Sequence, residues 1–187
     1  MWTPRTTLWI TLLCLVPTAG RAQTTSLSDH PGYFPLEELE IISSEEASVE
    51  INLQGAMLKM IGKATIAEDP EFAEIVSNLE AIRVRIAPME NLDPDKARSA
   101  MAQGAALLEE RGWQAMVRIR DEDEQVYIYS LESGESMAGM TVLVVDSDEA
   151  VMVNLVGDID FESLGSLVMG LDLPQVGRAL QQEDYQP

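Results

Sequence analysis

Apolar and polar residues form a repeating pattern in four consecutive segments of the second half of the chain. The segments cover residues 113–120, 125–131, 137–145 and 150–157, and they are rich in Val, Ile, Tyr and Met. The breaks between them are short and contain Asp, Glu, Ser and Gly, which favour turns. Short apolar segments separated by such turns are typical of antiparallel strands joined by hairpins. The sequence therefore predicts a four-stranded meander.

The segment before the meander predicts two further strands and three helices. Val49, Ile51 and Leu53 alternate with polar residues, which indicates a strand over 47–53, and a similar alternation indicates a second strand over 80–87. Capping residues and helical spacing of apolar residues predict helices over Gly55–Ile66, over Pro70–Leu79 with Asp69 as N-cap, and over Pro94–Arg111 with Asp93 before it and Gly112 after it. A last helix is expected after Asp160, with Phe161, Leu164, Leu167 and Val168 on one side.

This order of elements predicts an α+β fold. We expect a single two-layer domain over 47–171, with a mainly antiparallel sheet of about five to six strands and helices packed on one face. The third helix has an inner stripe whose small residues let it lie close to the sheet; the stripe consists of Ala97, Ala100, Met101, Gly104, Ala105 and Leu108. An extended arm over 23–46 is expected to pack partly on the domain because it is rich in apolar residues, and 172–187 is expected to form a tail.

The first 22 residues have the composition of an export signal. Arg5 precedes a short apolar segment, and small residues follow as far as Ala22. The apolar segment is too short to span a bilayer, so we expect a signal peptide cleaved after Ala22, no membrane span afterwards, and a periplasmic or secreted protein. Cys14 follows Leu13 and not a small residue, which argues against a lipoprotein. Since Cys14 is the only cysteine, the mature chain would have no disulfide and no thiolate.

The chain is strongly acidic. It has 32 Asp and Glu against 12 Lys and Arg, which gives a formal net charge of −20. Such a charge argues against nucleic acid as a partner and opposes docking on an anionic membrane. An adaptation of the surface to salt is an equally good interpretation of the same composition.

Four arginines in two of the expected strands suggest a binding surface. Arg83 and Arg85 alternate with aliphatic residues in the 80–87 strand, and Arg118 and Arg120 do so in the 113–120 strand. Tyr127 and Tyr129 should share the arginine face, which we expect to be the outer face of the sheet. Arginine pairs with carboxylates and stacks on aromatic rings, so this face is a candidate platform for a protein or an anionic ligand. The alternatives are an ordinary solvent-facing sheet surface, or a surface covered by the arm or by a second copy of the chain.

Other constellations give weaker indications. The acidic turns at 146–149 and 158–162 offer oxygen atoms of the kind that calcium prefers, but neither has the spacing of an EF-hand loop. Gly134-Glu135-Ser136-Met137-Ala138 departs from the nucleophile elbow of serine hydrolases at its last position, and the only histidine, His30, lies in the arm. No phosphate-binding or dinucleotide-binding loop is present in the sequence. We therefore assign no catalytic residue, no metal site and no cofactor.

Several short motifs resemble a bacterial family classified as domain of unknown function 4252. They are Pro31-Gly32-Tyr33, residues 48–53 followed by 56–60, Ile82-Arg83-Val84-Arg85, Gly112-Trp113 and residues 153–160. The resemblance implies an exported protein of a Gram-negative bacterium, and it brings no known activity and no catalytic residues. Together these observations predict a non-catalytic binding or accessory protein of the cell envelope. The alternative is a metal-dependent protein or enzyme that uses the two acidic turns.

Overall fold

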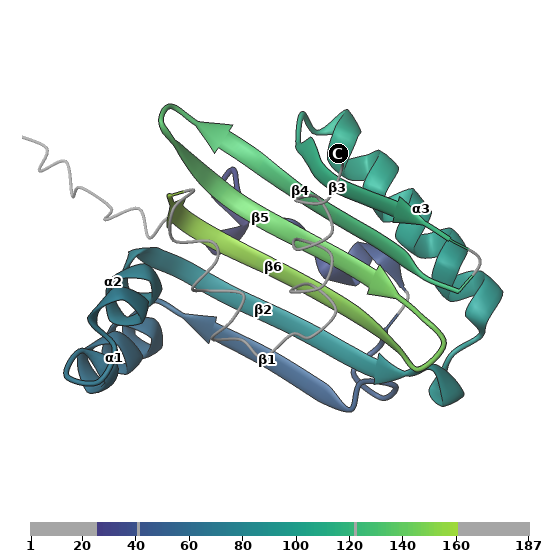
Figure 1. Cartoon of the computed structure of the whole chain (residues 1–187), viewed down its shortest axis with the longest axis horizontal. Coiled ribbons are helices and arrows are strands. Elements are labelled where there is room, and N and C mark those ends of the chain that lie inside the picture. The colour runs from purple at the N-terminus through teal and green to yellow at the C-terminus, as the bar shows by residue number, and fades with distance from the viewer. Residues whose placement is uncertain (1–25, 41, 122, 161–187) are drawn as a thin grey trace, which may run out of the picture.

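The computed structural model describes residues 26–40, 42–121 and 123–160 and has an α+β fold (Figure 1). Its strands are β1 (Val49–Gln54), β2 (Leu79–Pro88), β3 (Gln114–Arg120), β4 (Gln125–Ser133), β5 (Ser136–Val145) and β6 (Glu149–Ile159). Its helices are α1 (Ala56–Thr65), α2 (Pro70–Asn78) and α3 (Pro94–Glu110), and three short 3-10 turns are η1 (Leu27–Asp29), η2 (Leu36–Leu39) and η3 (Met89–Asn91). None of the helices in these ranges is long and apolar enough to cross a membrane.

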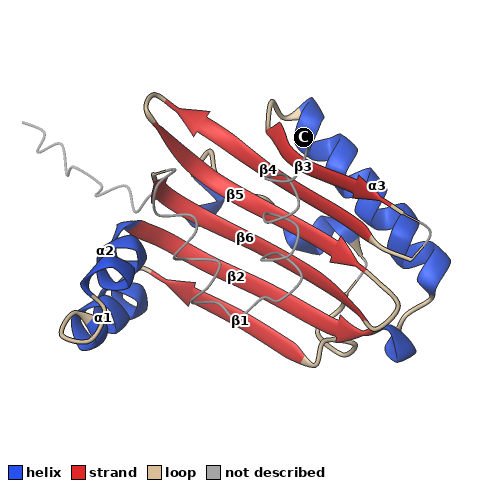
Figure 2. Ribbon diagram, viewed as in Figure 1, coloured by secondary structure: helices blue, strands red, loops and turns tan. Residues whose placement is uncertain are grey.

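The strands form one six-stranded sheet in the order β1-β2-β6-β5-β4-β3 (Figure 2). Each neighbouring pair is antiparallel, and β3 to β6 follow one another as the meander that the sequence predicted. The strand β2 pairs with β6, so the antiparallel pair of β1 and β2, which α1 and α2 connect, extends the sheet beyond the last strand of the meander. The two edges of the sheet are therefore β1 and β3.

The helix boundaries follow the predicted caps. The Asp69 side chain accepts a hydrogen bond from the Phe72 N–H at 3.0 Å, and Asp93 accepts from the N–H groups of Asp95 and Lys96, both at 3.1 Å. A proline follows each aspartate at the first helical position, where its missing N–H costs no hydrogen bond. The expected signal peptide and the helix expected after Asp160 lie outside the described residues.

The central strands of the sheet are buried on both faces. On one face, helix α3 and the segment around Phe34, Leu36, Leu39 and Ile42 form a core with Leu143 and Met152. On the other face, Val142, Val144, Val151 and Val153 form a second core, to which α1 and α2 contribute Leu58, Ile75 and Val76 at one end. The expectation that the arginine face is the outer face is therefore wrong, because α3 lies over it. The central strands β5 and β6 are apolar on both sides, so both faces need a cover.

Two glycines allow close packing on the face of the sheet that α3 covers. A Cβ atom on Gly104 of α3 would lie 2.9 Å from a Leu39 methyl group and 3.0 Å from a Leu143 methyl group, so this helix packs closely as its small residues predicted. A Cβ atom on Gly32 would lie 1.8 Å from the Ala138 carbonyl oxygen. The chain before η2 therefore lies directly on the backbone of β5.

Candidate functional site

The six residues of the predicted platform lie on one face of the sheet, the face that α3 covers. The register pairs Arg83 with Asn154 and Arg118 with Tyr127 across neighbouring strands, as the alternation predicted. They do not form one cluster. Arg83 and Arg85 lie on β2, whereas the other two arginines and both tyrosines lie on β3 and β4, with β6 and β5 between the two groups.

Arg83 and Arg85 hold down a segment of the arm that we call the strap, residues 31–40. Arg83 donates a hydrogen bond to the Phe34 carbonyl oxygen at 2.9 Å, forms an ion pair with Glu37, and stacks on the Tyr33 ring. The Arg83 side chain is only 8% exposed. Arg85 lies 3.8 Å from the Glu37 carboxylate of the strap, and it also contacts Glu50 of β1 at 3.0 Å and the Ile42 carbonyl oxygen at 3.2 Å. Both guanidinium groups are therefore occupied by acceptors of the chain itself.

These two arginines change the pKa of the Glu37 carboxylate. Partial burial raises the pKa of Glu37, but the hydrogen bond from Arg83 and the charges of Arg83 and Arg85 outweigh it. The pKa of Glu37 therefore lies below its ordinary value. The charged form of this carboxylate stabilises the docked strap.

In the second group of platform residues, Tyr129 and Arg118 both contact Glu109 of α3. The Glu109 carboxylate accepts a hydrogen bond from the Tyr129 hydroxyl at 2.6 Å and forms an ion pair with Arg118 at 2.5 Å. Burial, together with the hydrogen bond to Glu109, raises the pKa of Tyr129 to about 12, although Arg118 opposes the shift. Arg120 donates to the Tyr127 hydroxyl at 3.2 Å and lies over its ring. The tyrosine rings are buried, so they form part of the core beneath α3.

These contacts correspond to one of the three interpretations that the sequence left open, a face covered by the arm. Glu37, Glu109 and backbone carbonyl groups already occupy positions where a bound carboxylate or peptide would contact Arg83, Arg85 and Arg118. Binding of a ligand by the six residues stays a prediction. Such a ligand would have to displace the strap or compete with α3.

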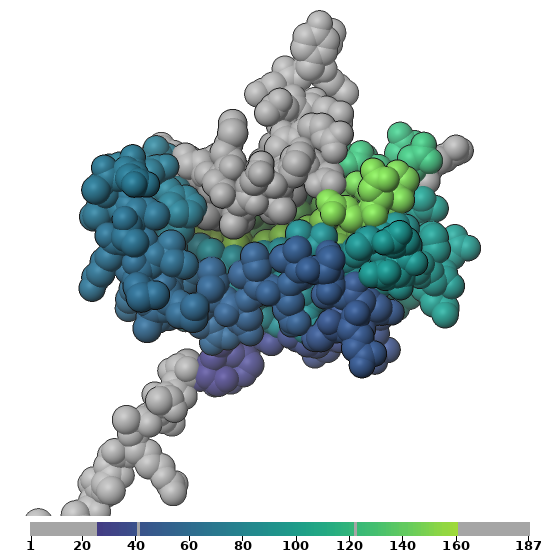
Figure 3. All heavy atoms as spheres, turned by 90° about the horizontal axis from the view of Figure 1, so that it is seen from below, coloured from purple at the N-terminus to yellow at the C-terminus, as the bar shows by residue number. Residues whose placement is uncertain are grey.

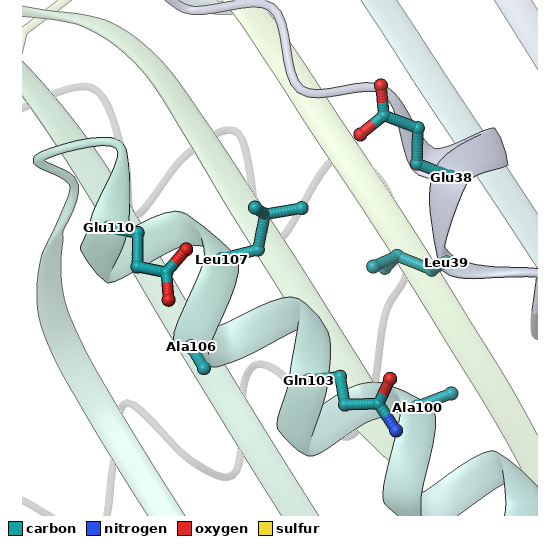
Figure 4. Close-up of a pocket in the computed structure, with 7 residues that line it drawn as sticks. All are labelled: Glu38, Leu39, Ala100, Gln103, Ala106, Leu107 and Glu110. Carbon is teal, nitrogen blue, oxygen red and sulfur yellow. The ribbon is translucent and has the colours of Figure 1, made fainter.

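A groove lies between η2 and α3 (Figure 4). It has a volume of about 350 Å³, within the range of small-molecule sites. Its apolar surface comes from Leu39, Ala100, Ala106 and Leu107, and Figure 4 shows Leu39 and Leu107 facing one another. The remaining lining residues are polar: Glu38, Gln103 and Glu110. The groove is therefore apolar at its centre and acidic at its margin.

The groove could not be predicted from the sequence. Glu38 and Leu39 are separated from Glu110 by most of the first half of the domain, so no local pattern brings them together. The only local signal was the run of small residues in α3, which was interpreted as a sheet contact. Ala100 and Ala106 leave room beside Leu107, and η2 supplies the opposite wall. Arg111 forms an ion pair with Glu38 at 2.9 Å, which fixes η2 near the C-terminus of α3.

Local hydrogen bonds hold the first acidic turn, residues 146–149. The Asp146 side chain accepts from the N–H groups of Asp148 and Glu149, at 2.7 and 2.8 Å, as in an ordinary aspartate turn. In the part of the chain that the structure describes, no three His, Cys, Asp or Glu side chains are grouped to hold a metal ion. Glu162 of the second acidic turn lies outside that part.

Ser136, from the motif that resembles a nucleophile elbow, begins β5 in the hairpin after β4. Its hydroxyl donates a hydrogen bond to the Ser133 carbonyl oxygen at 3.4 Å. The Nδ1 atom of His30 accepts a hydrogen bond from the Gly32 N–H at 3.1 Å, just before the strap. Each of these two side chains therefore has a local structural contact.

Comparison with family models gives one assignment. The model described as Domain of unknown function (DUF4252) matches residues 43–167, about two thirds of the chain. The chain belongs to the DUF4252 family. The match begins after the strap, so in this DUF4252 protein η2 contributes a wall of the groove from outside the matched range. No curated protein and no solved structure matches the chain.

Proposed function

We propose that this DUF4252 protein is an exported, non-catalytic binding protein of the cell envelope, and that its groove between η2 and α3 holds an apolar group attached to a positive charge. The export part of the proposal rests on the composition of residues 1–22. The binding part rests on one observation, a groove with apolar walls and carboxylates of Glu38 and Glu110 at its margin.

The charge of the ligand follows from the surroundings of the groove. A net charge of −20 attracts cations to the whole protein and repels anions. The arginines that could receive an anion on the sheet face are paired internally, as described above. Of the groove's two carboxylates, Glu38 already contacts Arg111, and its side chain is still 56% exposed. A basic group next to an apolar one therefore matches this groove better than an anionic ligand does.

A peptide probe tests the proposal. We would titrate the protein into a dye-labelled amphipathic peptide of leucine and lysine, and measure fluorescence anisotropy at low and moderate salt. We expect saturable binding that weakens with salt, and no saturable binding of the corresponding leucine and glutamate peptide. The double variant Glu38→Gln/Glu110→Gln should weaken binding about tenfold, which corresponds to about 1.4 kcal/mol.

Two further variants distinguish peptide binding at the groove from peptide binding to the acidic surface in general. Glu90→Gln/Glu132→Gln removes the same charge at two exposed positions outside the groove lining and should bind the peptide as the unmodified protein does. Leu107→Ser should weaken binding by removing an apolar wall. Equal loss of binding in both double variants would show that the peptide follows net charge alone, and would contradict the proposed site.

A further inference from the structure

The two edges of the sheet are built differently. At the β3 edge the register with β4 shifts between Ala115 and Val117, and the strand contains Arg118 and Arg120. Bulges and positively charged side chains are devices that prevent an edge strand from pairing with another chain. The β1 edge has no bulge within its paired residues, because its register with β2 runs without interruption from Val49 to Gln54, and its single charged side chain, Glu50, is paired with Arg85. The β1 edge is therefore open to another strand.

Exposed apolar side chains are concentrated on β1 and the helix that follows it. Five large apolar residues of the described chain are exposed, two on β1, two on α1 and one at the C-cap of α1: Val49, Ile51, Met57, Met60 and Ile66. Met60 is 64% exposed and Met57 is 50% exposed. Figure 3 looks onto this side of the molecule, with the blue segment around β1 in front and the teal helices at one end. A concentration of apolar surface at one site is characteristic of an interaction surface.

The backbone of β1 presents a regular row of hydrogen-bonding groups. The Gly55 N–H donates to the Glu80 carbonyl oxygen at 3.0 Å, so within the uninterrupted register from Val49 to Gln54 the odd-numbered residues direct their backbone groups towards β2. Just before this range, the Ser48 N–H also donates towards β2, to the Ile86 carbonyl oxygen at 2.8 Å. The N–H and C=O groups of Glu50, Asn52 and Gln54 therefore point away from the sheet. A strand that pairs there would bond to these three residues.

We propose that the occupant of this edge is β1 of a second copy of the chain, paired antiparallel about a two-fold axis perpendicular to the sheet. With Ile51 opposite Ile51 of the second copy, Val49 lies opposite Leu53 of the second copy. The apolar residues of both strands then meet on one face, and Glu50 lies opposite the amide of Asn52. The six strands of each copy join into one continuous sheet. This inference is independent of the proposed groove.

Electrostatics are compatible with this register. The Glu50 carboxylate is held by Arg85 at 3.0 Å, so the one charged side chain of β1 brings its own counter-ion to the edge. Shifting the second strand by one residue would place the apolar residues of the two copies on opposite faces, which their exposure disfavours. Because each copy has a formal net charge of −20, the two copies repel one another at long range. Added salt screens this repulsion, so it should strengthen the dimer.

A single cysteine tests the register directly. Ile51 would face its own symmetry mate in a pair without backbone hydrogen bonds, where Cα atoms lie about 4.5 Å apart, within reach of a disulfide. In a Cys14→Ser background, Ile51→Cys should form a disulfide-linked dimer upon mild oxidation, and non-reducing electrophoresis would detect it. Val49→Cys is the matched control, since Val49 lies opposite Leu53, so it should crosslink far more slowly.

A proline tests the backbone pairing without relying on side chains. The Asn52 N–H points away from β2, so Asn52→Pro removes no backbone hydrogen bond to β2 but blocks a bond to the second copy. It also removes the hydrogen bond that the Asn52 Oδ1 accepts from the Gln54 side chain at 2.8 Å, a loss for which Asn52→Thr is the control. Sedimentation over a concentration series should give a dimer for the unmodified protein and for Asn52→Thr, and a monomer for Asn52→Pro. If Asn52→Pro does not fold, Ile51→Lys serves in its place, because it sets two lysines opposite one another. A monomer at every concentration, a dimer that withstands both changes, or equal crosslinking of the two cysteine variants would overturn the proposal.

Discussion

The side chain of Asn154 on β6 holds the backbone of Phe34, 120 residues earlier in the chain. Its Oδ1 accepts a hydrogen bond from the Phe34 N–H at 3.0 Å, and its Nδ2 donates to the Gly32 carbonyl oxygen at 3.1 Å. Asn154 is fully buried, and its Nδ2 also lies 3.2 Å from the Thr141 hydroxyl. One buried amide therefore satisfies both a donor and an acceptor of the strap, and it positions η2 as the wall of the groove.

Replacing Asn154 with alanine should destabilise the protein strongly. The change leaves the Phe34 N–H and the Gly32 carbonyl group buried without partners, and each such loss costs about 1–3 kcal/mol. We expect the free energy of unfolding to fall by about 3 kcal/mol in urea denaturation. Gln114→Ala, at an exposed position of the edge strand β3, is the control and should change it by less than about 0.5 kcal/mol.

Gly139→Ala should loosen the strap from the sheet. A Cβ atom at this position would lie 2.6 Å from the Gly32 carbonyl oxygen and 2.7 Å from its Cα atom, so the two backbone segments must separate. We expect a loss of about 1–3 kcal/mol in the free energy of unfolding. The double variant Gly139→Ala/Asn154→Ala should lose less than the sum of the two single effects, because both changes release the same segment. Full additivity would contradict this account of the strap.

The docked strap should lose stability in acid through Glu37. Because the pKa of Glu37 is lowered in the folded protein, its contribution is present above the ordinary value of 4.5 and is lost as the pH falls through the lower folded value. Glu37→Gln should therefore lower the melting temperature at neutral pH, and the difference from the unmodified protein should shrink below pH 4.5. Thermal unfolding of both proteins at a series of pH values would measure this. A difference that does not depend on pH would argue against the ion pair with Arg83.

Tyr129 should ionise unusually late. Because its pKa is raised from 10.0 to about 12, its contribution to stability is complete below pH 10 and is lost as the pH rises towards 12. Ultraviolet difference absorbance of the phenolate, compared between the unmodified protein and Tyr129→Phe, would isolate this titration. Glu109→Gln should move it to lower pH because a negatively charged acceptor is removed. A phenolate that forms near pH 10 in the folded protein would contradict the buried contact with Glu109.

The strands and helices could be predicted because their signals are local. The Asp-Pro pairs at 69–70 and 93–94 begin α2 and α3, and the acidic turns separate the strands of the meander. Alternation along β2 and β3 also placed the four arginines on one face, since side-chain direction depends only on position within a strand.

The cover of that face could not be predicted in the same way. Alternation identifies the two sides of a strand, but β5 and β6 are apolar on both, so the pattern does not say which side meets a helix. The groove was also beyond prediction, since Leu39 and Leu107 face one another only after the strap has docked.

The sequence by itself therefore determined the elements, their caps and the side to which each strand residue points, because these depend on neighbours within a few positions. Only the tertiary structure decided what the arginines bind, where the groove opens and which strands form the edges of the sheet. These features depend on contacts such as Asn154 with Phe34 and Gly32 with Gly139, which join residues more than 100 positions apart.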